Sequence, residues 1–222
     1  MAVERFYVPA ASVDDWRARL ADPDKHWRED KSAMRLATSW HGAGGFPSAV
    51  RKVFSDCNPD EFGGIDFLVG LPEHQVPLPG GRRPSQTDLL VFARTATGRL
   101  AVIAVEGKTT EPFGPLVSEW LADASDGKLE RLDYLCNLLG LARDDAEPLR
   151  YQLLHRTASA VIEANRFTAP VAMMLVHSFG DPGESRGDFD RFARALGVAT
   201  DCELSRATGM SSAELYLAWV GE

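Results

Sequence analysis

The chain has 222 residues, of which 45% are hydrophobic and 25% are charged, and its formal net charge at pH 7 is -8. These values predict a single globular domain with a sizeable core. They argue against a generally basic nucleic-acid-binding coat, although they are compatible with a local basic face. The first residues carry no signal-peptide pattern and no apolar run approaches membrane-spanning length, so we expect a cytoplasmic protein that does not enter a membrane.

Cysteine usage indicates a reducing compartment. The three cysteines, Cys57, Cys136 and Cys202, are far apart in the sequence and form no CxxC pair. We therefore expect three free thiols and no zinc site.

Helices are predicted for most of the N-terminal part of the chain, residues 1–60. Apolar residues recur at helical spacing over 29–40 and 47–55, and the glycine cluster at 41–45 ends the first of these helices. The cluster lacks the G-x-G-x-x-G spacing and follows no strand, so it is not a dinucleotide-binding loop. We expect a helical extension that packs on an α/β core spanning residues 61–222.

The core begins with a strand predicted over 62–71, and a proline-rich loop over 72–84 follows it. Glu73 in this loop is a candidate additional metal ligand. Arg82 and Arg83 lie just before the acid at position 88, where they either meet a phosphate or are solvated loop arginines.

A buried β-hairpin is predicted in the middle of the chain. Residues 89–92 and 100–105 are almost wholly apolar, as in strands that are buried on both faces. Residues 96–98 between them have the length and the glycine of a three-residue hairpin loop. This loop fixes the register, because it makes Thr95 face Arg99.

The same register places two acids and a lysine together at the end of the hairpin. Asp88 faces Glu106, and Lys108 shares a strand face with Glu106, while Gly107 lies on the other face and leaves room for a close approach. Two carboxylates this close repel each other unless a cation or a shared proton compensates. A divalent cation held by carboxylates beside an ammonium group is a site for phosphodiester hydrolysis. The alternative is a Glu–Lys pair at a solvated strand end, with Asp88 as a turn residue.

Asp88, a hydrophobic strand and then Glu106-Gly107-Lys108 resemble the motif of the PD-(D/E)XK nuclease superfamily, which includes many restriction and repair endonucleases. The overall arrangement is similar to a bacterial branch of that superfamily, and it departs from the motif at Pro84, which is not adjacent to the acid. The resemblance implies a restriction-endonuclease-like core in which Asp88 and Glu106 hold Mg²⁺ or Mn²⁺ and Lys108 orients or deprotonates the attacking water. It also implies a nucleic-acid partner, DNA in the first instance, contacted through a local basic face.

A long helix predicted over 148–166 carries Gln152, Arg156 and Ser159 on one stripe. In relatives within the superfamily, a helix after the Glu-x-Lys strand presents a polar or basic residue to the site. The resemblance therefore implies Gln152 as a fourth site residue, and the alternative is the polar outer stripe of an ordinary helix. His155 on the same helix is either a general base or a structural residue.

The remaining elements complete an α/β pattern. Further helices are predicted over 116–124, 128–141 and 188–196, and further strands over 171–177 and 215–220. The order of these elements predicts a mixed β-sheet flanked by helices on both faces.

These features leave three functions open. The first is a metal-dependent nuclease that hydrolyses phosphodiester bonds in nucleic acid. The second, favoured by the acidic net charge, is a nuclease fold that serves as a catalytically inactive binding or assembly module. The third is a small-molecule hydrolase that uses the same carboxylates. A homodimer is compatible with each of them.

Overall fold

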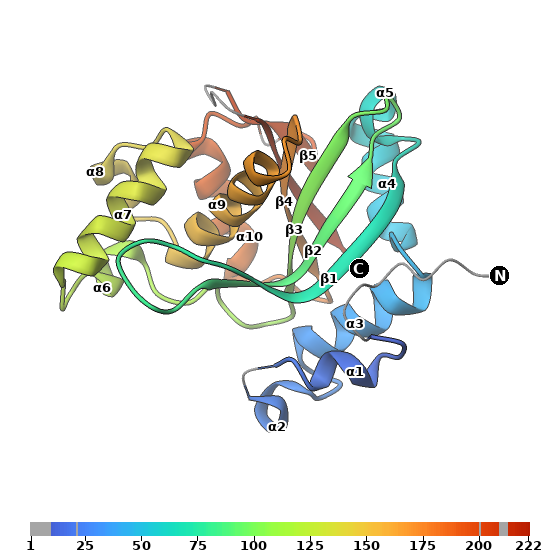
Figure 1. Ribbon diagram of the computed structural model, residues 1–222, viewed down its shortest axis with the longest axis horizontal. Helices are drawn as coiled ribbons and strands as arrows, with labels where there is room; N and C mark the ends of the chain where they lie inside the picture. The colour runs from blue at the N-terminus through green and yellow to red at the C-terminus, as the bar shows by residue number, and fades with distance from the viewer. Residues whose placement is uncertain (1–9, 21, 200, 209–212) are drawn as a thin grey trace.

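The computed structural model describes residues 10–20, 22–199, 201–208 and 213–222, which form a six-stranded sheet with helices on both faces (Figure 1). The strands are Asp66–Val76 (β1), Ser85–Arg94 (β2), Leu100–Lys108 (β3), Val171–Ser178 (β4), Leu204–Arg206 (β5) and Glu214–Gly221 (β6). Their order in the sheet is β1-β2-β3-β4-β6-β5. The first three strands are antiparallel to one another, β3, β4 and β6 are parallel, and β5 is antiparallel to β6. The predicted α/β class with a mixed sheet is confirmed.

The central strands β3 and β4 are buried on both faces. Successive residues of β3 alternate between the two sides of the sheet, so that Val102 and Ala104 enter one core while Ile103 and Val105 enter the other. Burial on both faces explains why these strands are near-continuous apolar runs in the sequence.

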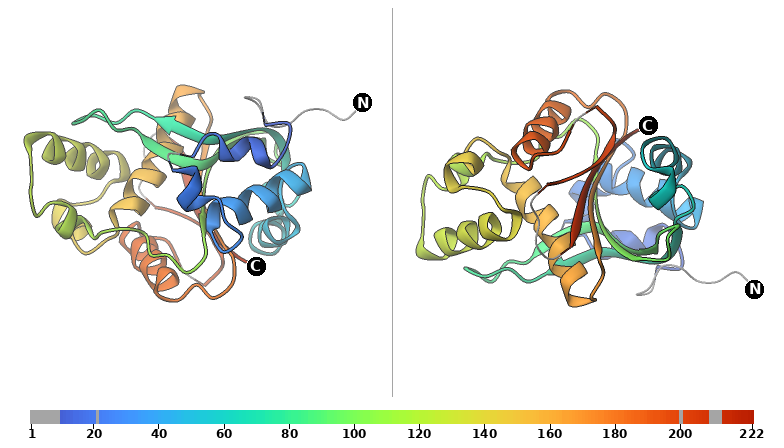
Figure 2. Two further views of the ribbon diagram at one scale, coloured as in Figure 1. Left: turned by 90° about the horizontal axis from the view of Figure 1, so that it is seen from below. Right: turned by 90° about the horizontal axis from the view of Figure 1, so that it is seen from above.

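One face of the sheet is covered by the helices that follow β3 and β4 (Figure 2). These helices are Val117–Trp120 (α6), Asp126–Leu139 (α7), Arg143–Ala146 (α8), Tyr151–Arg166 (α9) and Glu184–Ala195 (α10). Helix α9 lies against β2, β3 and β4 and buries Leu154 and Ala158 completely. It therefore carries any polar side chain on its sheet-facing side into the interior.

The opposite face is covered by the N-terminal helices (Figure 2). These are Asp14–Arg17 (α1), Pro23–His26 (α2), Ser32–Ala43 (α3), Ser48–Cys57 (α4) and Pro59–Phe62 (α5). Trp40, Val50 and Phe54 of these helices are fully buried in one core with Phe67 and Ile103 of the sheet. The expected packing of the N-terminal helices on the sheet is confirmed.

The predicted loop over 72–84 is wrong in its first half, because β1 continues to Val76 and pairs with Ser85. Since β1 is an edge strand, Pro72 can sit in it without breaking the ladder of a central strand. The true hairpin loop is therefore shorter, and Glu73 belongs to the sheet.

Other predicted boundaries differ at the short elements. Helix α9 begins at Tyr151 and not at Pro148, because Leu149 and Arg150 pair with the chain around Leu116 and Val117. The short elements α2, α5, α8 and β5 were not predicted, since none of them is long enough to show a periodic pattern.

The prediction of three free thiols is wrong. Cys57 at the end of α4 and Cys202 just before β5 form a disulfide, with their Cα atoms 6.0 Å apart, and only Cys136 is free. The two cysteines meet because α4 packs against β5 and β6. Sequence spacing cannot reveal this pairing, since 145 positions separate the two residues.

Reduction of this disulfide is expected to destabilise the fold. A crosslink between residues 145 positions apart restricts the unfolded chain strongly, and removing such a crosslink costs about 2–4 kcal/mol. We expect dithiothreitol to lower the melting temperature of wild type, and Cys57→Ser to melt at the lower temperature with or without reductant. Cys136→Ser is the matched control, because it should keep the full response to reductant. Identical melting of oxidised and reduced wild type would contradict the prediction.

None of the helices in the described ranges has the length and apolarity that a membrane crossing requires.

Candidate functional site

The register predicted for the β2–β3 hairpin is confirmed. Pairing runs from Leu89–Val105 to Arg94–Leu100. Gly98 in the connecting loop has a φ of 85°, the left-handed conformation that glycine adopts without a steric penalty. The hairpin loop therefore sets the position of every residue at the far end of the two strands.

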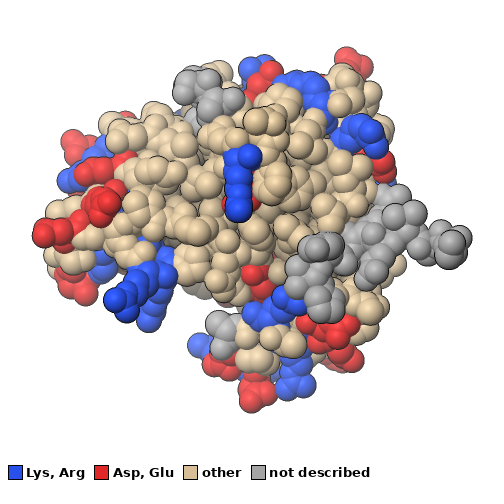
Figure 3. All heavy atoms as spheres, in the orientation of Figure 1, with Lys and Arg blue, Asp and Glu red and all other residues tan. Residues whose placement is uncertain are grey.

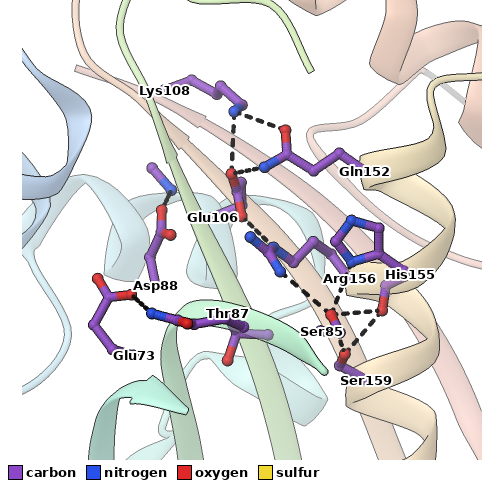
Figure 4. Close-up of polar contacts among 12 residues, drawn as sticks. Glu73, Ser85, Thr87, Asp88, Glu106, Lys108, Gln152, His155, Arg156 and Ser159 are labelled. Atoms are coloured by element: carbon purple, nitrogen blue, oxygen red, sulfur yellow. Dashed lines mark hydrogen bonds and ion pairs between the residues drawn. The ribbon is translucent and has the colours of Figure 1, made fainter. Parts of the chain in front are cut away.

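Three acidic residues occupy neighbouring positions across β1, β2 and β3. Asp88 and Glu106 follow the last residue pair of the β2–β3 register, which makes them opposite each other. Glu73 lies between two residue pairs of the β1–β2 register that place it opposite Asp88. Figure 4 shows these side chains at the same end of the sheet, with Glu106 directed toward α9 and with Asp88 and Glu73 farther from that helix.

Asp88 is held against the backbone of β3. Its Oδ2 accepts a hydrogen bond from the Gly107 N–H at 2.8 Å. A Cβ atom at position 107 would lie 3.4 Å from that oxygen and 3.3 Å from the Ser32 carbonyl oxygen, so glycine permits the close approach. Burial, reinforced by the negative charge of Glu106, raises the pKa of Asp88 to about 7.

Glu106 is surrounded by hydrogen-bond donors. Its Oε1 accepts from Lys108 Nζ at 3.0 Å and from Gln152 Nε2 at 2.6 Å, and its Oε2 accepts from Arg156 Nε at 2.6 Å (Figure 4). Burial opposes ionisation of this carboxyl, but the charges of Arg156 and Lys108 outweigh it and lower the pKa of Glu106. Glu106 is therefore a carboxylate at neutral pH.

Lys108 and Gln152 form a closed triangle with Glu106. Lys108 Nζ donates to Gln152 Oε1 at 3.0 Å and lies 4.7 Å from the centre of the Phe113 ring. Lys108 and Glu106 are each only 3% exposed, so the alternative of a solvated strand-end pair is wrong. All four predicted site residues, with Asp88 included, line one cavity.

A second group of polar residues, which the sequence did not single out as a unit, ties α9 to the start of β2. Ser85 Oγ lies 2.8 Å from His155 Nδ1, accepts from Ser159 Oγ at 2.8 Å, and accepts from an Arg156 terminal nitrogen at 3.3 Å. Ser85 and Ser159 are buried, so the alternative of an outward-facing polar stripe on this helix is wrong. The sequence feature that could have indicated this group is the recurrence of polar residues at 152, 156 and 159 on a helix with a buried apolar face.

His155 is kept neutral. Burial, followed by the positive charges of Arg156, Arg131 and Lys108, lowers its pKa well below the usual value. A weakly basic imidazole is a poor proton acceptor at neutral pH. This environment favours the structural role over the general-base role.

Glu73 has features that are typical of a functional position. Its φ of 54° is rare for a residue other than glycine. Its Oε2 accepts from Gln86 Nε2 at 2.7 Å, while burial and then the charge of Asp88 raise its pKa to about 8. Arg82 and Arg83, by contrast, are exposed and lie outside the cavity lining, as expected for solvated loop arginines.

The cavity has a volume of about 560 Å³. One wall is formed by α9 and the loop at residues 111–115, and the other by His26, Ser32 and Ala33 of the N-terminal part. The face drawn in Figure 3 is largely uncharged, with basic and acidic side chains scattered mainly near its outline, and the described residues form no broad basic field there.

The acids of the cavity are an incomplete ligand set for a metal. In the described part of the chain, no group of three or more His, Cys, Asp or Glu side chains is arranged to hold an ion. Asp88 and Glu73 are nevertheless carboxyl groups whose pKa values are raised first by burial and then by the charge of a neighbouring carboxylate. Carboxylate oxygens are the ligands that Mg²⁺ and Mn²⁺ prefer, so the chemistry of these residues fits such an ion.

The fold and the cavity define an α/β protein with a buried carboxylate–lysine site. The chain belongs to the family described as Domain of unknown function (DUF6946), whose model matches residues 9–222. Neither the curated proteins nor the solved structures include a match to this chain.

Proposed function

We propose that the protein is a metal-dependent phosphodiesterase that acts on nucleic acid. The observation that carries this proposal is the buried Lys108–Glu106–Gln152 triangle beside Asp88 at one end of the sheet. These are the residues implied by the resemblance to the PD-(D/E)XK superfamily. Charged groups are rarely buried together without a functional reason or a full set of partners.

The topology supports a restriction-endonuclease-like core. Three antiparallel strands lead through the helices that include α9 to β4, which is parallel to β3. The acid pair and the lysine lie on the two strands of the hairpin, and Gln152 lies on the helix of the crossover.

Asp88 and Glu106 are the proposed ligands of Mg²⁺ or Mn²⁺, with Glu73 as a third carboxyl on the neighbouring strand. When bound, the ion would supply Lewis-acid charge to the phosphate and favour ionisation of water. Lys108 would contact the phosphate or the attacking water, and Gln152 would hold its ammonium in place through the 3.0 Å hydrogen bond. Arg156 would share the compensation of the Glu106 charge with Lys108, so that the Lys108 ammonium could also act on the substrate.

Metal-dependent cleavage tests the proposal. We expect wild type to cleave nucleic acid with Mn²⁺ and not with EDTA, and Asp88→Asn to lose cleavage. Asp66→Asn is the matched control, because Asp66 is an exposed acid at the first residue of β1, outside the cavity. Asp88→Asn protein that cleaves as fast as wild type would refute the assignment of this residue.

One observation favours a second candidate, an inactive binding or assembly module. Arg156, Lys108 and Gln152 already occupy three acceptor positions of Glu106, which a metal ion would also need. A wild-type protein that cleaves no nucleic acid with any divalent ion would make this second function the better one.

A further inference from the structure

The reactive groups of the proposed site lie at the bottom of a cavity. Lys108 and Glu106 are each 3% exposed, and the cavity that leads to them measures about 560 Å³. This volume lies within the range of pockets that enclose a small ligand, about 300–1,000 Å³. A phosphate group must therefore enter the protein before Lys108 can touch it.

The N-terminal helices form the wall of the cavity opposite α9. The Ser32 carbonyl oxygen lies 3.3 Å from the position of a Cβ atom at residue 107, which shows how closely the start of α3 approaches β3. Glu111, in the loop after β3, lines the same cavity, and although burial opposes its ionisation, hydrogen bonding with Ser32 and Thr109 lowers its pKa. In Figure 1, α3 lies near the end of β3, and α2 lies beyond α3. This wall restricts access from the N-terminal side.

A base-paired duplex is a poor match to this geometry. DNA has a persistence length of about 150 base pairs, so a duplex cannot bend one phosphate away from its neighbours and into a cavity at low cost. An unpaired strand is flexible and can insert a single phosphate. Resting on the proposed function, we infer that the substrate is an unpaired nucleic-acid strand or a frayed end.

The chemistry of the cavity wall agrees with an unpaired strand. Tyr151 lines the cavity, and its ring stacks on Trp120, with ring centroids 4.0 Å apart and an interplanar angle of 9°, while the His155 ring lies 4.9 Å away. Unpaired bases bind to aromatic rings, whereas non-specific duplex binding depends on several phosphate contacts to Lys and Arg. A net charge of -8 disfavours duplex binding through phosphate contacts more than it disfavours the binding of unpaired bases to aromatic rings.

The experiment compares substrates that differ only in pairing. Wild type with Mn²⁺ is given a labelled single-stranded DNA, the matching RNA, the blunt duplex of the same sequence, and bis(4-nitrophenyl) phosphate. Opening one base-pair step costs enough that only about one duplex molecule in 10 has that step open. We therefore expect the single strands to be cleaved at least about 10-fold faster than the duplex. The rates on single-stranded DNA and on RNA show which of the two nucleic acids is preferred.

A variant that narrows the cavity gives an independent test. Ala33→Trp places a large ring on the wall formed by α3 and should slow cleavage of the single strands more than that of bis(4-nitrophenyl) phosphate. Thr38→Trp is the matched control, because Thr38 is exposed on the same helix and outside this cavity. Melting curves identify variants that are not folded, and the wild-type comparison does not depend on either variant.

The outcomes separate the inference from the proposed function. Cleavage of the duplex at the rate of the single strand would overturn the inference and leave the nuclease function standing. Absence of cleavage on all four substrates would overturn the nuclease function, and the inference with it. Labelled strands and duplex titrated with Lys108→Ala protein add a binding measurement, in which equal affinities would also overturn the inference.

Discussion

Lys108→Ala is expected to lower the rate of nucleic-acid cleavage by about 10²-fold or more, the usual scale for the loss of a positioned proton-transfer group. Lys108 Nζ is fixed by Glu106 and Gln152, each at 3.0 Å, and by the ring of Phe113. The substitution removes an ammonium group and neither carboxylate. Mn²⁺ binding should therefore persist or tighten, because one competing cation is gone.

Two further variants sharpen this test. Lys108→Arg should not restore full activity, since a guanidinium differs in shape and does not deprotonate in proteins. Lys52→Ala, which removes an exposed lysine of α4, should leave the rate unchanged. Cleavage is measured as nicking of plasmid and as degradation of single-stranded DNA and RNA with Mn²⁺. Equal rates for wild type and Lys108→Ala would show that the lysine does not act in the reaction.

The end of the hairpin could be predicted from the sequence because a local feature determines it. A three-residue loop with a glycine fixes the register, and strand alternation then assigns each side chain to a face. That is why the contact between Lys108 and Glu106, and the room left at Gly107, followed from residue order alone. Gln152, by contrast, was implied by the resemblance to the superfamily, and its side chain donates to Glu106.

The features that could not be predicted depend on contacts between distant segments. The hydrogen bonds of Ser85 with α9 and the Cys57–Cys202 disulfide join residues that only the packing of helices on the sheet brings together. The position of Glu73 in a strand was not predicted for another reason. The prolines around it are typical of a loop, yet an edge strand tolerates them, so the third acid of the site lies within β1.

Metal-free Asp88→Asn protein is expected to be more stable than wild type at alkaline pH. Asparagine keeps an oxygen that can accept the Gly107 N–H and removes the charge that faces Glu106 and Glu73. Raising the pKa of Asp88 from 3.8 to about 7 means that ionisation destabilises the folded state by about 4 kcal/mol. The variant should therefore gain up to about this amount of unfolding free energy.

The pH window of this effect follows from the direction of the shift. The folded protein holds a proton on Asp88 that the unfolded chain has already lost, so wild-type stability falls as pH rises from about 4 to about 7. Glu73 acts in the same direction up to about pH 8, while the charges of Arg156 and Lys108 oppose the effect. The difference between Asp88→Asn and wild type should be small near pH 4 and largest at pH 8, as measured by urea denaturation in EDTA.

Mn²⁺ should narrow this difference in stability between Asp88→Asn and wild type. An ion that binds the carboxylates of the folded state, and not the unfolded chain, stabilises wild type by about 2.7 kcal/mol at a concentration of 100 times its dissociation constant. Asp88→Asn should lose most of that gain, whereas Asp66→Asn should keep it, because Asp66 lies outside the cavity. If wild type and Asp88→Asn respond equally to Mn²⁺ at pH 8, the ion binds elsewhere, and the carboxylates beside Lys108 are not its site.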